Sequence, residues 1–191
     1  MTLVELMMAL AITAIVALAA AGMLSAVTYG SAERTDMRSL LVRQEMIAQR
    51  LSAAVRASRQ VLDADDDRLI LWVSDANHDD VTQVSEVRWI HFSENDGTLT
   101  STSVSFPDHL THEQMDALDA VFNPAQSMQS QLSGLGSYVV MQTWAQGVAG
   151  WELSSRDATE KRPGLLNFRV TFADQYNQRQ TIIGAAALRS Q

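Results

Sequence analysis

The strongest hydrophobic pattern in this chain is an unbroken apolar run near the N-terminus. Residues 6–28 (LMMALAITAIVALAAAGMLSAVT) contain no charged side chain, and Glu5 is the only charged residue before Glu33. A helix of this length reaches roughly 35 Å, which is enough to cross the hydrocarbon core of a membrane, about 30 Å thick. The pattern therefore predicts a membrane-spanning helix at the N-terminus.

Beyond this run the apolar positions keep helical spacing. They recur three, four and seven residues apart and mark one face of a helix, and neither Pro nor Gly interrupts residues 31–62. The members of this face are Met37, Leu40, Leu41, Ile47, Ala48, Leu51, Ala54 and Val55. We predict one helix from about residue 2 to residue 58. Two helices separated near Tyr29 and Gly30 are the alternative.

After the helix the hydrophobic period changes to two, which is typical of strands. Residues 69–73, 86–92 and 98–104 are the first predicted strands, with a turn at residues 95–97 between the last two. Residues 138–144, 150–154, 166–172 and 181–188 are the later ones.

A short helix is predicted between these two groups of strands. Thr111 and Gln114 have the spacing of a capping box, so a helix should run over His112–Phe122 and end before Pro124. Residues 123–137, rich in Gln, Ser and Gly, are predicted to form a loop, as are the charged residues 155–164. The expected fold is α+β, with the long helix packed on a mostly antiparallel sheet.

Composition narrows the functional classes. The 191 residues include 14 basic and 22 acidic side chains, a net charge of −8, which argues against a nucleic-acid binder. The absence of cysteine excludes disulfides, thiolate metal sites and cysteine nucleophiles. Residues 33–191 hold 14 basic and 21 acidic residues and form an ordinary acidic domain.

The apolar run admits more than one explanation. A secretory signal peptide requires a basic segment before the apolar run, and the sequence has Glu5 there instead, although small residues at 17–21 resemble a cleavage site. A plain anchor fits the length and leaves Glu5 unexplained. A charge beside the apolar segment indicates a functional residue, because burying it in a membrane is costly; alternatively Glu5 lies at the headgroup level and favours the positive helix N-terminus, and both can hold at different stages.

The N-terminus resembles that of mature type IV pilins and type II secretion pseudopilins. Thr2-Leu3-Val4-Glu5-Leu6 followed by an apolar helix matches their motif, while Met1 stands where phenylalanine is usual and no proline interrupts residues 1–58. The family's short leader, removed by a prepilin peptidase, is absent, so we expect the numbering to begin at the mature residue or at a gene start placed there. The resemblance implies a pilin-like fold, with residues 1–30 as the transmembrane and assembly half of the helix and residues 31–191 as the globular domain.

The resemblance also implies a role for the first residues. In this family the glutamate pairs with the N-terminal amine of an adjacent subunit during assembly, so Met1, Thr2 and Glu5 are the expected assembly residues. The implied partners are other pilin or pseudopilin subunits. The implied location is the inner membrane, crossed once with the globular domain outside the cytoplasm, and then a periplasmic or extracellular filament.

A finer resemblance concerns the C-terminal half. Residues 147–153 (GVAGWEL), a charged loop, Pro163, residues 166–172 and the pair Leu188-Arg189 are similar to J-type minor pseudopilins and related minor pilus subunits. J-type subunits join two other minor pseudopilins at the filament tip. A subunit repeated along a pilus is the alternative.

Residues 75–86 (DANHDDVTQVSE) have the ligand spacing of an EF-hand calcium loop. Oxygen-bearing side chains or a backbone carbonyl fall at positions one, three, five, seven, nine and twelve, which are Asp75, Asn77, Asp79, Val81, Gln83 and Glu86. Asp80 replaces the usual glycine at position six, and strands rather than helices are predicted on either side. A solvated acidic turn is the alternative. The acidic cluster at residues 63–67 is predicted to be the loop that leaves the helix.

Catalytic patterns are weak. His109 and His112 lack the order and the third ligand of a zinc site, and a helix N-terminus explains them better. The sequence shows no Gly-rich phosphate loop and no Gly-x-Ser-x-Gly motif, and Lys161 is its only lysine. We therefore expect no enzyme. The two remaining hypotheses are a structural subunit of a filament and a membrane-anchored monomeric domain that binds calcium or another ligand.

Overall fold

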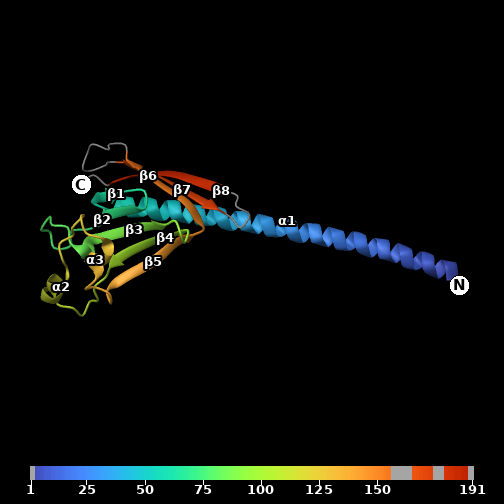
Figure 1. Ribbon diagram of the computed structural model, residues 1–191, viewed down its shortest axis with the longest axis horizontal. Helices are drawn as coiled ribbons and strands as arrows, with labels where there is room; N and C mark the ends of the chain where they lie inside the picture. Colours follow the sequence, from blue (N-terminus) through green and yellow to red (C-terminus); the bar gives the residue numbers. More distant parts are fainter. Residues whose placement is uncertain (1–2, 156–164, 174–178, 189–191) are drawn as a thin grey trace. The chain divides into compact units, whose positions relative to one another are not determined.

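A computed structural model describes residues 3–155, 165–173 and 179–188 (Figure 1). Its first element is α1, Leu3–Ala57, a continuous helix of 55 residues. The prediction of one helix is therefore confirmed, and the break near Tyr29 and Gly30 does not occur. The helix ends where the Ser58 hydroxyl donates to the Ala54 carbonyl at 2.6 Å. The chain divides into two compact units, Met1–Val42 and Arg43–Gln191.

The second unit contains a five-stranded antiparallel sheet in the order β1-β2-β3-β4-β5. The bounds are Gln60–Ala64 for β1, Arg68–Trp72 for β2, Val87–Ser93 for β3, Thr98–Val104 for β4 and Val139–Gln146 for β5. Four of these strands confirm the predicted segments, with bounds shifted by at most two residues.

Strand β1 was not predicted, and it takes in the first two residues of the acidic cluster at 63–67, which we expected to be loop. The strand has only five residues, and Val61 is its one buried side chain. So short a strand shows no recognisable alternation. Its pairing with β2 is what makes it a strand.

A second antiparallel sheet has the order β6-β7-β8, with β6 at Val148–Ser155, β7 at Leu165–Ala173 and β8 at Arg179–Ala187. These strands contain the predicted segments 150–154 and 166–172 and almost all of 181–188. Gly184 in β8 lies against the ring of Phe168, where an added Cβ would be 2.2 Å from Cζ. The strand register therefore requires glycine at this position.

The short helix α2 spans His112–Leu118 and begins with the predicted capping box of Thr111 and Gln114. It ends four residues before the predicted end at Phe122. The reason is tertiary: the Val84 N–H donates to the Ala120 carbonyl and the Phe122 N–H donates to the Thr82 carbonyl, both at 2.9 Å. This bridge to the loop before β3 keeps residues 120–122 extended.

The predicted loop at residues 123–137 contains a further helix, α3, at Met128–Leu132. Ser127 caps it by accepting a hydrogen bond from the Ser130 N–H at 3.2 Å. The helix has five residues and one buried side chain, Leu132. A helix of little more than one turn leaves no periodicity for a sequence pattern to reveal.

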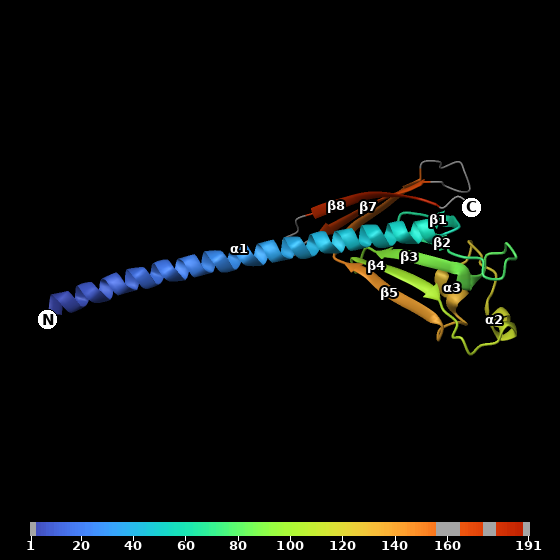
Figure 2. The same ribbon diagram turned by 180° about the vertical axis from the view of Figure 1, so that it is seen from behind.

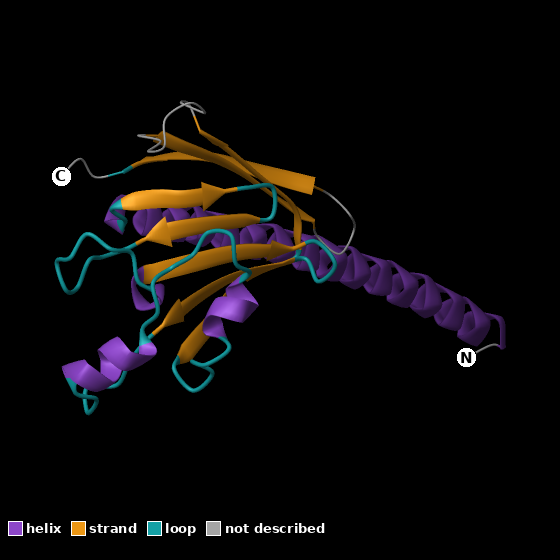
Figure 3. Cartoon of the chain, turned by 60° about the vertical axis from the view of Figure 1, so that its left-hand side comes forward, coloured by secondary structure: helices purple, strands orange, loops and turns teal. Residues whose placement is uncertain are grey.

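The core of the second unit lies on both faces of the five-stranded sheet. Consecutive residues Leu69–Trp72 of β2 are all buried, and neighbouring side chains of a strand point to opposite faces. Figure 3 shows α3 on one face and the last turns of α1 on the other. The cluster beneath α3 consists of Ile70, Val84, Val87, Trp89, Val104, Phe122, Leu132 and Leu135. The described fold is α+β.

Candidate functional site

The first candidate site is the apolar surface of the N-terminal part of α1. Leu3–Ser25 has a mean hydropathy of 2.4, and none of it is buried within the chain. Leu3, Leu18 and Met23 are each about three-quarters exposed. Soluble proteins rarely expose so long an apolar surface, which therefore requires an apolar environment. The segment has the length and composition of a membrane anchor or a signal sequence.

Glu5 lies in the first turn of α1, where a carboxylate is favoured by the positive end of the helix dipole. The following residues Leu6, Met7 and Met8 are each more than half exposed, so Glu5 borders an apolar surface. Met1 and Thr2, the other two expected assembly residues, lie outside the described residues.

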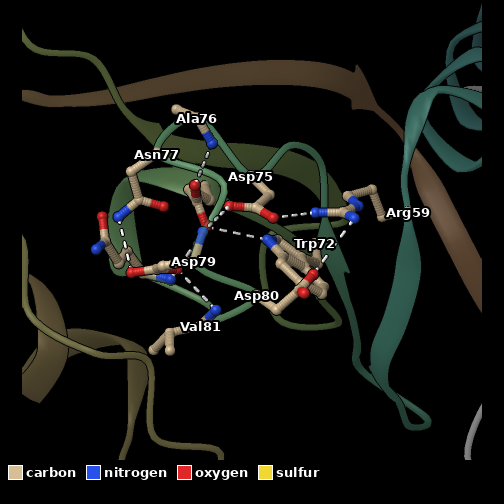
Figure 4. A network of polar contacts seen from close by, with 10 residues as sticks. Arg59, Trp72, Asp75, Ala76, Asn77, Asp79, Asp80 and Val81 are labelled. Atoms are coloured by element: carbon tan, nitrogen blue, oxygen red, sulfur yellow. Dashed lines mark hydrogen bonds and ion pairs between the residues drawn. The ribbon is translucent and has the colours of Figure 1, made fainter.

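The second candidate site is the acidic loop, residues 73–83, between β2 and the short 3₁₀ helix η1 at Val84–Glu86 (Figure 4). Arg59, from the link between α1 and β1, forms an ion pair with Asp75 and lies 3.6 Å from Asp80. Its guanidinium also sits over the Trp72 ring, 4.7 Å from the centroid. One arginine therefore fixes the start of the loop to the end of the long helix.

Glu86 closes the loop at its other end. The residue is 3% exposed, and its carboxylate accepts hydrogen bonds from Trp72 Nε1 at 3.0 Å, from the Gln83 N–H at 3.3 Å and from the Ala76 N–H. Three donors satisfy a carboxylate that is buried away from water. Glu86 therefore joins the two ends of the loop to the sheet.

The middle of the loop is held by its own polar groups. The Val81 N–H donates to Asp79 Oδ1 at 2.8 Å, and Asn77 Nδ2 donates to Asp79 Oδ2 at 2.9 Å. His78 and Asp80 adopt the left-handed conformation, with φ of 60° and 57°. Asp80 stands where an EF-hand loop has its glycine, and its backbone conformation is the one that glycine favours.

The six residues expected to bind calcium are only partly brought together. Asp75, Asn77 and Asp79 lie close enough to form hydrogen bonds, because the Asp79 N–H donates to Asp75 Oδ1 and Asn77 donates to Asp79. Glu86 is engaged by Trp72 and two backbone N–H groups, and Asp75 by Arg59. Among the described residues no three His, Asp or Glu side chains converge as metal ligands would. This arrangement does not fit a cation held by all six positions, and calcium binding stays a prediction.

Two carboxyl groups of this region have shifted pKa values. Burial raises the pKa of Asp75, but the hydrogen bond and charge of Arg59 and the N–H groups of Asp79 and Asp80 outweigh it, so the pKa lies below its ordinary value. Burial raises the pKa of Asp119, and hydrogen bonds from Ser85 offset this only in part. The charges of Glu86 and Asp116 raise it further.

Three residues of this site cannot be recognised from the sequence. Arg59 and Trp72 lie outside the loop, and no spacing rule connects them to Glu86. Asp119 is far from the loop in sequence, yet it accepts hydrogen bonds from the Ser85 N–H at 2.9 Å and from the Ser85 hydroxyl. Only the fold brings these groups together.

Comparisons with family models, with curated proteins and with solved structures find no match to this chain.

Proposed function

We propose that this protein is a structural subunit of a type II secretion pseudopilus or a type IV pilus, similar to a J-type minor pseudopilin. The observation that supports this most is the exposed apolar surface of Leu3–Ser25, whose one charged residue is Glu5 in the motif at residues 2–6. Such a surface packs against lipid before assembly and against the same helices of neighbouring subunits afterwards. Its many alanines, together with Gly22, let helix backbones approach closely.

Glu5 sets the axial register of this packing. Its carboxylate pairs with the N-terminal amine of an adjacent subunit, and this attraction is strong because the surroundings are apolar. The pair fixes how far one helix slides along the next, since a shift of one turn would separate the charges.

The proposed life cycle begins in the inner membrane, which the protein crosses once with its globular domain outside the cytoplasm. A prepilin peptidase exposes the N-terminal amine, and the subunit then enters a periplasmic or extracellular filament. The protein is proposed to be neither an enzyme nor a nucleic-acid binder.

The test is a Glu5→Leu substitution in the full chain, with a photo-crosslinker attached at Leu10, in membranes that contain the other subunits. Losing one partner of a buried ion pair costs about 3–5 kcal/mol, and about 1.4 kcal/mol corresponds to a factor of ten, so cross-linking to other subunits should fall by at least about 100-fold. The amount of protein in the membrane fraction should not change.

Glu5→Asp is the matched control, because it keeps the charge and should retain part of the cross-linking. The proposal fails if the Glu5→Leu protein cross-links as strongly as the unmodified chain.

Two alternatives make different predictions. A pilin repeated along a filament would cross-link through Leu10 mainly to copies of itself. A membrane-anchored monomeric calcium- or ligand-binding domain would give no cross-links through residues 1–28, and millimolar calcium would raise its Tm. The left-handed conformation of Asp80 favours the calcium alternative. An unchanged Tm would reject the calcium site.

A further inference from the structure

Strand β5 forms one margin of the five-stranded sheet (Figure 2). Four consecutive residues, Val140–Thr143, are exposed, so this part of the strand is uncovered on both faces. Val140 is 50% and Met141 is 65% exposed. Within the described residues β5 pairs only with β4. The outward backbone N–H and C=O groups of this margin are available to another strand.

Natural proteins protect such margins with charged residues, prolines, bulges or very short strands. Strand β5 has eight residues (VVMQTWAQ) without a charge or a proline. Its one irregularity, beside Leu99 and Thr100 of β4, leaves Val139–Thr143 in regular pairing. The opposite margin differs, because β1 has five residues, carries Asp63 and is itself irregular. An unprotected margin of this kind is typical of a surface that is covered in the assembled state.

A groove of about 250 Å³ lies beside this margin. Arg43 and Met46 of α1 form one wall, and residues 143–146 of β5 form the other. Met46 is 44% exposed. Arg43 is also exposed, and it makes no ion pair with any residue that the structure describes. The β5 margin, defined as Val139–Gln146 with this groove, therefore combines apolar side chains with a cation.

A strongly acidic surface lies elsewhere in the second unit. Residues 60–123 hold 14 of the 22 acidic residues and only two of the 14 basic ones, a net −12, so the rest of the chain carries +4. The acidic loop and α2 contribute exposed carboxylates around three exposed apolar residues. We call this surface the acidic face; it consists of Asp79, Asp80, Val81, Glu113, Asp116, Leu118 and Val121.

The members of the acidic face come from segments that are tied together. Val121 bridges to Gln83 in antiparallel fashion, and Asp119 accepts hydrogen bonds from Ser85. Val81 and Val121 thus lie on adjoining segments, at 40% and 64% exposure. The acidic face matches the β5 margin in apolar character and opposes it in charge.

We propose that the β5 margin of one subunit receives the acidic face of a second copy of this chain. Residues 120–122 of the second copy, which are extended, add to the free edge of β5, and the carboxylates of the acidic face meet Arg43. The contact joins two different surfaces, so each subunit offers both halves and the association does not close on itself. The inference rests on the alternative within the proposed function in which the subunit is repeated along the filament, and it adds a contact between globular domains to the contact through α1.

The experiment uses the full chain in nonionic detergent. Because the chain has no cysteine, Met141→Cys introduces a single thiol, and a benzophenone attached there captures whatever lies on β5. The proposal expects a cross-linked dimer whose captured peptide comes from residues 74–83 or 112–121. A dimer captured elsewhere, or none, overturns it.

A benzophenone on Leu10→Cys separates this result from the proposed function. Cross-links at Leu10 without cross-links at Met141 overturn the β5 contact and leave assembly through the helix in place. If neither position cross-links, the β5 contact fails, and assembly with other subunits is decided by the Leu10 experiment in membranes that contain them. Ile183→Cys on β8, which is 70% exposed, is the matched control and should capture no copy. Equal yields at Ile183 and Met141 would show unspecific contact and overturn the proposal.

The charge requirement is tested at Arg43, which is exposed and can be changed without removing a buried group. Arg43→Glu should lower the cross-linking yield at Met141 by about tenfold, whereas Arg43→Lys should retain most of it. The yield of the unmodified contact should also fall at high salt. An unchanged yield in Arg43→Glu contradicts the role of charge and overturns the pairing with the acidic face.

Discussion

Asp119 fastens the end of α2 to η1 through a single side chain. Both carboxylate oxygens accept hydrogen bonds from Ser85, one from the N–H at 2.9 Å and one from the hydroxyl. These bonds do not fully offset the burial of the charge or the nearby Glu86 and Asp116, so the pKa of Asp119 is raised. A carboxyl whose pKa is higher in the folded than in the unfolded state costs stability once it is ionised.

We therefore expect Asp119→Asn to equal or exceed the unmodified protein in Tm at pH 7. The amide keeps both contacts, because its oxygen accepts from the Ser85 N–H and its nitrogen donates to the hydroxyl. Because the pKa of Asp119 is raised, its protonation increases the stability of the unmodified protein as pH falls through the folded pKa toward the ordinary value of 3.8. The variant should lack this increase in stability. Thermal melts between pH 3 and 7 measure both effects.

Asp119→Ala is the control, since it removes both hydrogen bonds and should lower the Tm throughout this range. A lower Tm for Asp119→Asn at pH 7 would contradict the conclusion that ionised Asp119 costs stability.

The pKa shift of Asp75 is opposite in sign to that of Asp119. Its lowered pKa means that the ion pair with Arg59 stabilises the fold above the ordinary pKa of 3.8, and that this contribution is lost as pH falls through the folded pKa. The two aspartates therefore shift stability in opposite directions in acid.

At the scale of elements, the packing of β8 on β7 depends on one missing side chain. An added Cβ at Gly184 would lie 2.2 Å from Cζ and 2.5 Å from Cε2 of Phe168, whose side chain is almost fully buried. Neither the buried ring nor the paired backbone can move away without breaking the register between the strands.

Gly184→Ala should lower the free energy of unfolding by about 1–3 kcal/mol, the usual cost of overpacking a core. Denaturant melts of the full chain in detergent measure it. Gly136→Ala is the matched control, because no heavy atom lies within 4 Å of the added Cβ. Phe168→Leu combined with Gly184→Ala should recover part of the loss. A change at Gly184 as small as that at Gly136 would contradict this account of the register.

Long elements with a clear hydrophobic period were predicted from the sequence, and two short ones without it were not. Strands β3 and β4 alternate over seven residues each and were predicted within a residue or two. β1 and α3 have five residues and one buried side chain each, too few to show either period, whereas the equally short β2 was predicted because Leu69–Trp72 form a continuous apolar run. α2 was predicted too long, since its sequence remains compatible with a helix up to Pro124 and only the bridge to residues 82–84 ends it.

At the scale of the whole molecule, the apolar segment determines the environment that the chain needs. An arginine at the centre of a membrane-spanning helix costs about 2.5–3.5 kcal/mol. Ile12→Arg should therefore reduce the share of the protein in the membrane fraction by about tenfold or more, as measured by fractionation after alkaline extraction. Met46→Arg, outside the apolar segment, should leave that share unchanged. Equal membrane shares for the Ile12→Arg and unmodified proteins would contradict a membrane-embedded helix.

Features that depend on residues close together in the chain follow from the sequence alone. The apolar run, the uninterrupted helix from Leu3 to Ala57, the capping box at Thr111 and the longer strands all follow from local periodicity, which folding preserves. The Thr2–Leu6 motif belongs to the same class, because its residues are adjacent in the chain.

Features that join distant segments depend on the tertiary structure. The fold gives the Glu86 carboxylate hydrogen bonds from Trp72 Nε1 and from two backbone N–H groups, partners that the loop spacing did not indicate. Arg59 became the partner of Asp75, and strand order left β5 at the margin beside Arg43. The physical reason is that a buried charge needs hydrogen-bond partners. The fold brings these partners near, although they lie far away in the sequence.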